Sequence, residues 1–174
     1  MTVKRILTEP NKLLRQISKS VDKVGKNEQK LMDDMVETMY AANGIGLAAI
    51  QIGFPKRIIV MDISKDQTNK NPMYFVNPII LNKATEQSTY EEGCLSVPDQ
   101  FAEIDRPNKC EVEYLDYNGK KKLLKADGLL ATCIQHEMDH LEGILFIDYL
   151  SKLKKSMIVK KLTKQKEQLD RIVI

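Results

Sequence analysis

Both histidines of this 174-residue chain lie in one segment, residues 135–143, which reads QHEMDHLEG. On a helix, residues four apart stand one turn above each other, so His136 and His140 can point their imidazoles at one metal ion. Glu137, about 100° round the helix from His136, lies beside this face, as in helices for metal-assisted amide hydrolysis with glutamate as general base. An ordinary amphipathic helix is the alternative, but histidines confined to this spacing weigh against it. The fold therefore has to build a helix here.

Length and composition favour one soluble globular domain over residues 1–174. The residues are 43% hydrophobic and 29% charged, which is enough apolar surface for a core in a chain of this length. No apolar run reaches the length of a signal peptide or a membrane helix, so we expect a cytoplasmic protein without a membrane partner. Cys94, Cys110 and Cys133 are odd in number and scattered, which argues against a disulfide framework and leaves at least one thiol for chemistry.

Apolar periodicity predicts helices near the start and in the middle of the chain. A proline followed by an apolar pair starts a short helix within residues 8–15. A second helix runs from residue 28 to a C-cap at residues 43–44. The metal helix spans residues 128–141, after an N-cap at Asp127 and before Gly143. It is apolar on several faces, so we expect it in the core.

Runs of β-branched and apolar residues, bounded by Gly, Pro and Asn, predict strands between these helices. We expect extended segments at residues 57–63, 73–81, 85–96, 110–117 and 120–125. The last two flank Asn118-Gly119, the strongest short hairpin signal, so they should pair antiparallel. The order of elements predicts an α+β domain, with antiparallel β-sheets around a central metal-binding helix, N-terminal helices and a C-terminal amphipathic helix.

The C-terminal segment, residues 151–174, concentrates the basic charge. It holds eight basic and two acidic residues, which makes it +6 while the rest of the chain is −3. Apolar positions at Leu150, Leu153, Met157 and Leu162 predict an amphipathic helix with a lysine-rich face. The lysines either form a solvated face or bind a polyanion such as RNA.

A catalytic zinc-type site has three protein ligands and keeps one position open for water, so a third ligand must come from elsewhere. No histidine follows His140, and Glu167 and Asp170 lie in the basic tail. Cys94, next to Gly93, is the better candidate, because a thiolate flanked by glycine can approach a metal closely. From spacing alone, a small buried hydrophobe is the commoner role of such a cysteine.

Three motifs in one order resemble those of the peptide deformylases. They are residues 44–51, GIGLAAIQ; residues 92–96, EGCLS; and residues 135–140, QHEMDH. The resemblance covers nearly the whole chain, since residues 10–15 and the terminal helix also match the family's pattern. It fits the bacterial class with a cysteine in the second motif and a C-terminal helix. Thr132 departs from the pattern, being polar where relatives tend to be apolar, which bears on side-chain preference rather than on chemistry.

The resemblance implies an enzyme that hydrolyses the N-formyl group from the N-terminal formyl-methionine of newly synthesised proteins and releases formate. The implied metal ligands are Cys94, His136 and His140. Glu137 would act as general acid and base on a metal-bound water, the nucleophile. Gln51 and the backbone N–H of Leu95 would bind the oxyanion, although Gln51 alone could equally satisfy a buried loop.

The resemblance also implies how substrate, metal and partners bind. Gly46 and Gly93 would offer backbone hydrogen bonds to an extended peptide, much as an added strand does. The residues implied around the methionine side chain are Ile45, Tyr90, Glu92, Leu129, Cys133 and His136. One divalent ion per chain is implied, Fe(II) in the cell, with Zn, Ni or Co possible in preparations. The expected partners are formyl-methionyl nascent peptides and, through the basic helix, the ribosome, with no DNA.

Two other functions stay open from the residues alone. An unrelated zinc peptidase with the same helix motif would cleave internal peptide bonds and use a downstream acid as ligand. A non-catalytic binding module would hold a structural metal, but structural zinc sites need four protein ligands, and no fourth Cys or His is evident. Neither accounts for residues 44–51, whose small side chains let a backbone pass close to a strand or a ligand.

Overall fold

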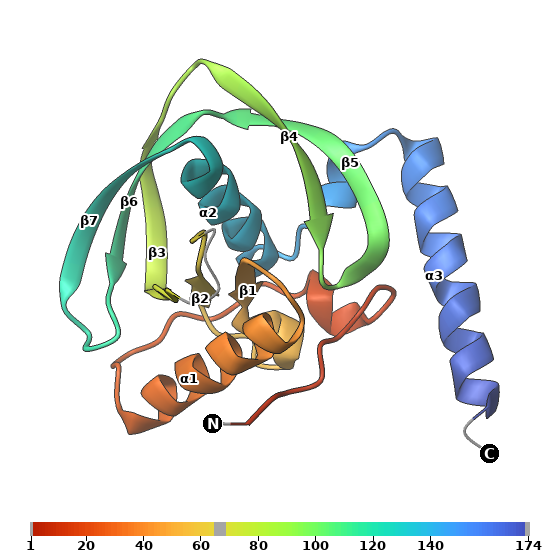
Figure 1. Ribbon diagram of the computed structural model, residues 1–174, viewed down its shortest axis with the longest axis horizontal. Helices are drawn as coiled ribbons and strands as arrows, with labels where there is room; N and C mark the ends of the chain where they lie inside the picture. The colour runs from red at the N-terminus through yellow and green to blue at the C-terminus, as the bar shows by residue number, and fades with distance from the viewer. Residues whose placement is uncertain (1, 65–68, 173–174) are drawn as a thin grey trace.

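The computed structural model describes residues 2–64 and 69–172 (Figure 1). The α-helices are α1 (Lys26–Ala41), α2 (Gly128–Leu141) and α3 (Lys152–Ile172). Short 3-10 helices are η1 (Lys12–Arg15), η2 (Ala49–Ile52) and η3 (Phe146–Tyr149). The strands are β1 (Gly46–Ala48), β2 (Ile58–Met61), β3 (Met73–Lys83), β4 (Gln87–Cys94), β5 (Val97–Pro107), β6 (Lys109–Leu115) and β7 (Lys121–Asp127). No helix of these described residues is long and apolar enough to span a membrane.

Antiparallel strands lie on both sides of α2 (Figure 1). One sheet has the strand order β1-β2-β3-β6-β7, and β4 and β5 form a separate two-stranded ribbon. Strands β6 and β7 pair antiparallel on either side of Asn118-Gly119, as the hairpin signal predicts. Strands of both sheets contact α2. The predicted α+β architecture, with the histidine-bearing helix at its centre, is confirmed.

Strand β2 joins the two halves of the core because it is buried on both faces. Ile58 and Val60 pack in the cluster that α1 covers. Ile59 and Met61, which point the opposite way, pack in the cluster around α2. A strand covered on both faces reads as a continuous apolar run instead of an alternating one, which is the pattern of this segment. Both clusters therefore place β1, the neighbour of β2, next to α2.

The predicted helix ends fall where glycine or asparagine permits a left-handed backbone. Asn43, just past α1, has φ 55°, and Gly143, just past α2, has φ 72°. A Cβ atom at Gly143 would lie 2.7 Å from the backbone carbonyl carbon of Arg15, so this position also needs glycine for space. Asp127 occupies the N-cap position of α2 as predicted, but its side chain makes no capping hydrogen bond there.

The prediction of strands missed one strand, which lies in a polar part of the sequence. Strand β5 was not predicted, and the expected extended segment 85–96 covers only β4. The ribbon of β4 and β5 is held by backbone pairing and is half exposed, so its sequence lacks an apolar run. The extended run predicted at 57–63 forms a strand only over β2. Residues 44–51, expected to pass close to a strand or a ligand, form β1, which pairs with β2, and most of η2.

The C-terminal helix is present as predicted, but part of its apolar stripe is not used for packing. Leu162 is buried, and Leu150 packs partly against the same small cluster. Leu153 and Met157, expected on that stripe, are 72% and 62% exposed. The face that meets the body is instead set by Ile158 and Leu162, which are one turn apart.

Candidate metal centre

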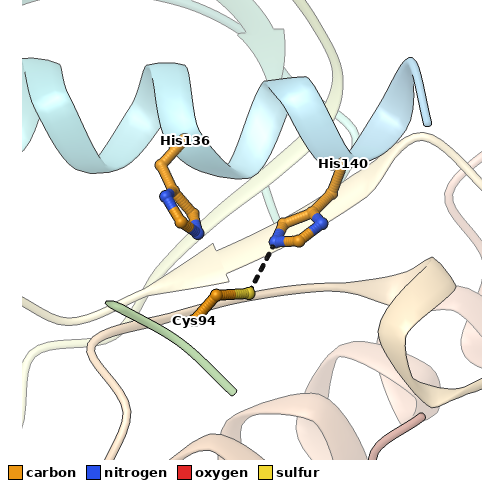
Figure 2. Close-up of side chains that lie close together, drawn as sticks. All are labelled: Cys94, His136 and His140. Atoms are coloured by element: carbon orange, nitrogen blue, oxygen red, sulfur yellow. Dashed lines mark hydrogen bonds between the residues drawn. The ribbon is translucent and has the colours of Figure 1, made fainter. Parts of the chain in front are cut away.

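Helix α2 and the end of β4 bring three metal-binding side chains together (Figure 2). His136 and His140 project from one face of α2, and Cys94 approaches that face from the last residue of β4. The candidate ligand atoms of the three residues all lie within 4.8 Å of one another. The Cys94 Sγ atom is 3.3 Å from His140 Nε2. A thiolate and two imidazoles converging in this way fit a divalent transition metal.

A buried carboxylate orients the first histidine. Glu92 Oε2 lies 2.8 Å from His136 Nδ1, which leaves Nε2 of the ring for a metal. Arg106 donates from Nε to Glu92 Oε1 at 2.5 Å and from Nη2 to Oε2 at 3.0 Å. Arg106 also donates from Nη1 to Asp139 Oδ2 at 2.8 Å. Burial raises the pKa of Glu92, but the hydrogen bonds of His136 and Arg106 outweigh it and lower the pKa below its ordinary value.

The two imidazoles experience opposite electrostatic environments. Burial lowers the pKa of His136, but its contacts with Cys94 and Glu92 outweigh this and raise it well above the ordinary value. Burial, reinforced by the positive charges of His136 and Arg106, lowers the pKa of His140 well below its ordinary value. A neutral imidazole is the form that binds a metal, so the low pKa favours this form in His140, whereas His136 has to release its proton when a metal binds.

Glu137 lies next to the ligand group in a tightly packed, buried position. Its Oε2 atom is buried and has no hydrogen-bond partner among the described residues. A Cβ atom at Gly46 would lie 2.9 Å from the Glu137 Cδ atom, so glycine is what lets β1 pass this carboxyl group. Burial raises the pKa of Glu137 to about 7. A carboxyl group with a pKa near neutrality can both take up and release a proton.

The amide of Gln51 is held in a fixed orientation beside Cys94. Its Oε1 accepts a hydrogen bond from the backbone N–H of Ala48 at 2.8 Å. Its Nε2 donates to Ser96 Oγ at 3.0 Å and lies 3.6 Å from Cys94 Sγ. Leu95 follows Cys94 directly and packs over Gly44, where a Cβ atom would meet its Cδ1 at 2.7 Å. Two donors assigned from the sequence, the Gln51 amide and the Leu95 backbone, thus flank the candidate ligand.

A cavity of about 510 Å³ opens beside these groups. Of the residues assigned to the site from the sequence, His140 alone does not line it. The others that do are Ile45, Gly46, Gln51, Tyr90, Glu92, Gly93, Cys94, Leu95, Leu129, Cys133, His136 and Glu137. Glu92 lines the cavity, but both of its oxygens are bonded to Arg106 and His136, so little of its polarity is left for a ligand.

Sequence reasoning missed three contributors to this centre. Arg106 and Asp139 complete the network behind His136, and Ser96 holds the Gln51 amide. Arg106 lies on β5 and reaches Glu92 only through the pairing of β4 with β5, which carries no local signal. Asp139 and Ser96 lie inside recognised motifs, so their positions, though not their partners, were within reach of the sequence.

Comparisons with known proteins show the family to which the chain is similar. The model of the polypeptide deformylase family matches residues 3–156. The chain is 78% identical over 174 residues to a peptide deformylase of Pelagibacter ubique (strain HTCC1062), covering 100% of both chains. It is 52% identical over 164 residues to one of Rhizobium meliloti (strain 1021), covering 94% of each.

Solved structures show the same fold. A crystal structure of a peptide deformylase from Ehrlichia chaffeensis in complex with actinonin is similar, with a TM-score of 0.89 and 46% identity. The match covers 95% of this chain and 98% of that chain. A peptide deformylase from Legionella pneumophila has a TM-score of 0.89 and 42% identity, with 98% and 99% of the two chains covered.

Proposed function

The chain belongs to the peptide deformylase family of metal-dependent hydrolases, which remove the N-formyl group from the N-terminal methionine of nascent proteins, and we propose that Cys94, His136 and His140 are its catalytic metal ligands. The convergence of their ligand atoms within 4.8 Å is the observation that carries the proposal. When bound, a divalent cation lowers the pKa of water from about 15.7 to about 7 and so supplies a nucleophile at neutral pH.

Glu137 moves the proton in this mechanism. Its Oε2, buried and without a partner among the described residues, accepts a proton from the attacking water. The same atom then gives the proton to the nitrogen of the departing amine, which otherwise is a poor leaving group. The raised pKa of about 7 suits both steps.

Two donors stabilise the negative charge that develops on the formyl oxygen. The Gln51 Nε2 donates to that oxygen, and the contacts with Ala48 and Ser96 hold the amide in place before substrate arrives. The backbone N–H of Leu95 is the second donor. One such preorganised contact contributes about 2.7 to 4 kcal/mol to transition-state stabilisation.

Glu92 acts by positioning His136 instead of contacting the methionine side chain. The hydrogen bond at 2.8 Å fixes the ring, and the Arg106 guanidinium keeps the carboxylate charged inside the protein. Substrate contacts fall to the other lining residues. Gly46 and Gly93 bind the extended peptide backbone, while Ile45, Tyr90, Leu129 and Cys133 surround the methionine side chain.

The donor set argues for the metal and against the rival functions. Cys-His-His suits iron, zinc, cobalt or nickel, and we assign Fe(II) as the ion in the cell, with the others possible in preparations. In a zinc peptidase of this kind a downstream acid would be the third ligand, whereas here Cys94 occupies that position. A structural site needs four protein ligands, whereas the group found in the described part of the chain has three.

The cellular location of the enzyme follows from its substrate, the formylated nascent chain, and from the positive charge of α3. Formylated nascent chains emerge from ribosomes, so the enzyme works in the cytoplasm. Exposed lysines of α3 contact ribosomal RNA in this proposal and raise the local concentration of substrate. Residues 1–174 work as one catalytic domain with α3 as its docking helix.

The test of the proposed function is formate release from formyl-Met-Ala, with acetyl-Met-Ala and an internal peptide bond substrate as controls. We expect formate from the formyl peptide, no acetate from the acetyl peptide and no cleavage of the internal peptide bond. Cleavage of the internal bond without formate release would instead support the peptidase alternative.

A further inference from the structure

One buried polar group in the cavity has no part in the proposed mechanism. Thr132 lies on α2, is 4% exposed and lines the cavity beside Leu129 and Cys133. Its Oγ1 atom has no hydrogen-bond partner among the described residues. A buried hydroxyl without a partner is unfavourable, so a position that keeps one calls for an explanation.

The other helical threonines of the described chain show the usual solution. Thr38 on α1 donates from Oγ1 to the carbonyl of Asp34 at 2.6 Å. Thr163 on α3 donates to the carbonyl of Val159 at 2.8 Å. Both are the common bond to the residue four positions earlier. Thr132 makes no such bond, so its hydroxyl is available to a group bound in the cavity.

Thr132 lies on the face of α2 that carries the histidines, next to residues assigned to the methionine side chain. It precedes His136 by four residues, about 6 Å along α2 at 1.5 Å per residue, on the same helix face. In the proposed function Leu129 and Cys133 surround the methionine side chain, and Thr132 lies between them on α2. The neighbouring Leu129 is apolar, and burial raises the pKa of the Cys133 thiol well above its ordinary value and keeps it neutral. Of these three residues of α2, Thr132 alone carries a hydroxyl donor.

We propose that Thr132 is a specificity-determining residue whose Oγ1–H donates a hydrogen bond to an acceptor at the end of the substrate's first side chain. The pocket then accepts N-formyl-methionine sulfoxide as well as N-formyl-methionine. A thioether sulfur is a weak acceptor, whereas the oxygen of a sulfoxide is polar and needs a donor when it leaves water. This inference rests on the proposed deformylase function and assigns the substrate range of that site.

The test compares kcat/KM for formyl-Met(O)-Ala and formyl-Met-Ala in the metal-loaded wild type, Thr132→Val and Thr132→Ser. Valine keeps the shape of threonine and removes the hydroxyl, and serine keeps the hydroxyl. We expect the sulfoxide-to-methionine ratio to fall about fivefold or more in Thr132→Val and to be retained in Thr132→Ser. Formyl-norleucyl-Ala has no acceptor, so its kcat/KM should not fall in Thr132→Val, and a fall equal to that of the sulfoxide peptide would contradict the hydrogen bond.

A second readout separates a hydrogen bond from mere packing. A sulfoxide sulfur is chiral, so a fixed donor should favour one epimer, and this preference should disappear in Thr132→Val. Melting temperature and metal content show whether each variant is folded, and Thr132→Ala gives the same comparison if the valine variant does not fold. An unchanged substrate ratio together with an unchanged epimer preference in the folded variants would overturn the inference while leaving the deformylase function intact. A wild type that releases no formate from any formyl peptide would instead overturn the proposed function.

Discussion

The Glu92 carboxylate lies 2.8 Å from His136 Nδ1 and thereby ties the β4–β5 ribbon to the metal helix. The same ribbon carries Cys94, so one structural unit supplies both a ligand and the group that orients another ligand. Arg106, on the paired strand β5, closes this arrangement by bonding both oxygens of Glu92. The metal centre is therefore built at the junction of α2 and the ribbon.

We predict that Glu92→Gln lowers metal affinity by about 10- to 100-fold, as expected when a group behind a metal-binding histidine is removed. The amide can still bond to His136, but it removes one of the two carboxylates, Glu92 and Asp139, that pair with the buried Arg106 guanidinium. Metal affinity is measured by competition with a chelator. The matched control is Glu103→Gln, an exposed glutamate on β5, which should bind metal like the wild type. Equal metal affinity in both variants would show that Glu92 does not support metal binding.

Glu137→Gln should lose catalysis and keep its metal. Glutamine preserves the shape of the side chain but cannot accept the proton, so formate release should fall by about 100-fold or more. The control is Glu142→Gln, because Glu142 is exposed and pairs with Arg57 away from the cavity. Metal content is measured alongside the rate, and near-normal turnover of metal-loaded Glu137→Gln would contradict the assignment.

Removing a proposed ligand should remove the metal. Cys94→Ala and His140→Ala each leave two ligands, so both proteins should be isolated with almost no bound metal by elemental analysis. Cys110→Ala and Cys133→Ala should retain it, since neither thiol belongs to the ligand group. Stoichiometric metal in Cys94→Ala would show that the third ligand is a different residue.

Asp62 should stabilise the fold in a pH-dependent way. Burial raises the pKa of Asp62, but hydrogen bonds from Ser64, Tyr40 and Asn71 outweigh it and lower the pKa from 3.8 to about 2. A depressed pKa stabilises the folded state above pH 3.8, and this contribution is lost as the pH falls towards 2. We expect Asp62→Asn to lower the free energy of unfolding by about 2 kcal/mol at pH 6 and by little at pH 2. A difference that does not change with pH would refute this.

The basic face of α3 should mediate salt-sensitive binding to ribosomes. Lys160, Lys161 and Lys164 are exposed, and reversing all three to glutamate leaves the buried Leu162 in place. The reversed protein should no longer co-sediment with ribosomes at about 50 mM salt, where phosphate contacts are strong. Its formate release from a short peptide should persist.

The control is a variant in which three lysines on or beside β7 are changed to glutamate, which alters the total charge by the same amount. Strand β7 lies at the other side of the molecule from α3 (Figure 1). Lys120, Lys122 and Lys125 lie on or beside that strand and are exposed. Reversing them should leave ribosome binding intact. Equal co-sedimentation of the wild type and both variants would show that α3 does not mediate ribosome binding.

The sequence carries a clear signal wherever the structure depends on local periodicity. The spacing of His136 and His140 predicts a helix with both rings on one face, and Asn118-Gly119 predicts the β6–β7 hairpin; the structure has both. The role of Cys94 had no such local signal. Its nearness to the histidines depends on β4, which is far from α2 in the sequence but adjacent to it in the fold. Spacing alone could not choose between a ligand and a buried thiol, and the family motifs decided it.

What the sequence could not give are contacts between polar residues on different elements. Arg106 lies in a charged, alternating segment that forms β5 only because it pairs with β4. The exposure of Leu153 and Met157 shows the same limit, since an apolar stripe predicts a helix but not which side of it finds a partner. Such contacts depend on the tertiary arrangement, which no local pattern encodes.

The most direct test of the account is a titration of Fe(II), under anaerobic conditions, into metal-free protein while formate release from formyl-Met-Ala is measured. The group of Cys94, His136 and His140 predicts a rate that is negligible without metal, rises in proportion to added Fe(II) and saturates at one ion per chain. Formate release that is independent of metal, or that continues to rise well beyond one ion per chain, would contradict the assignment of these three residues as the catalytic metal centre.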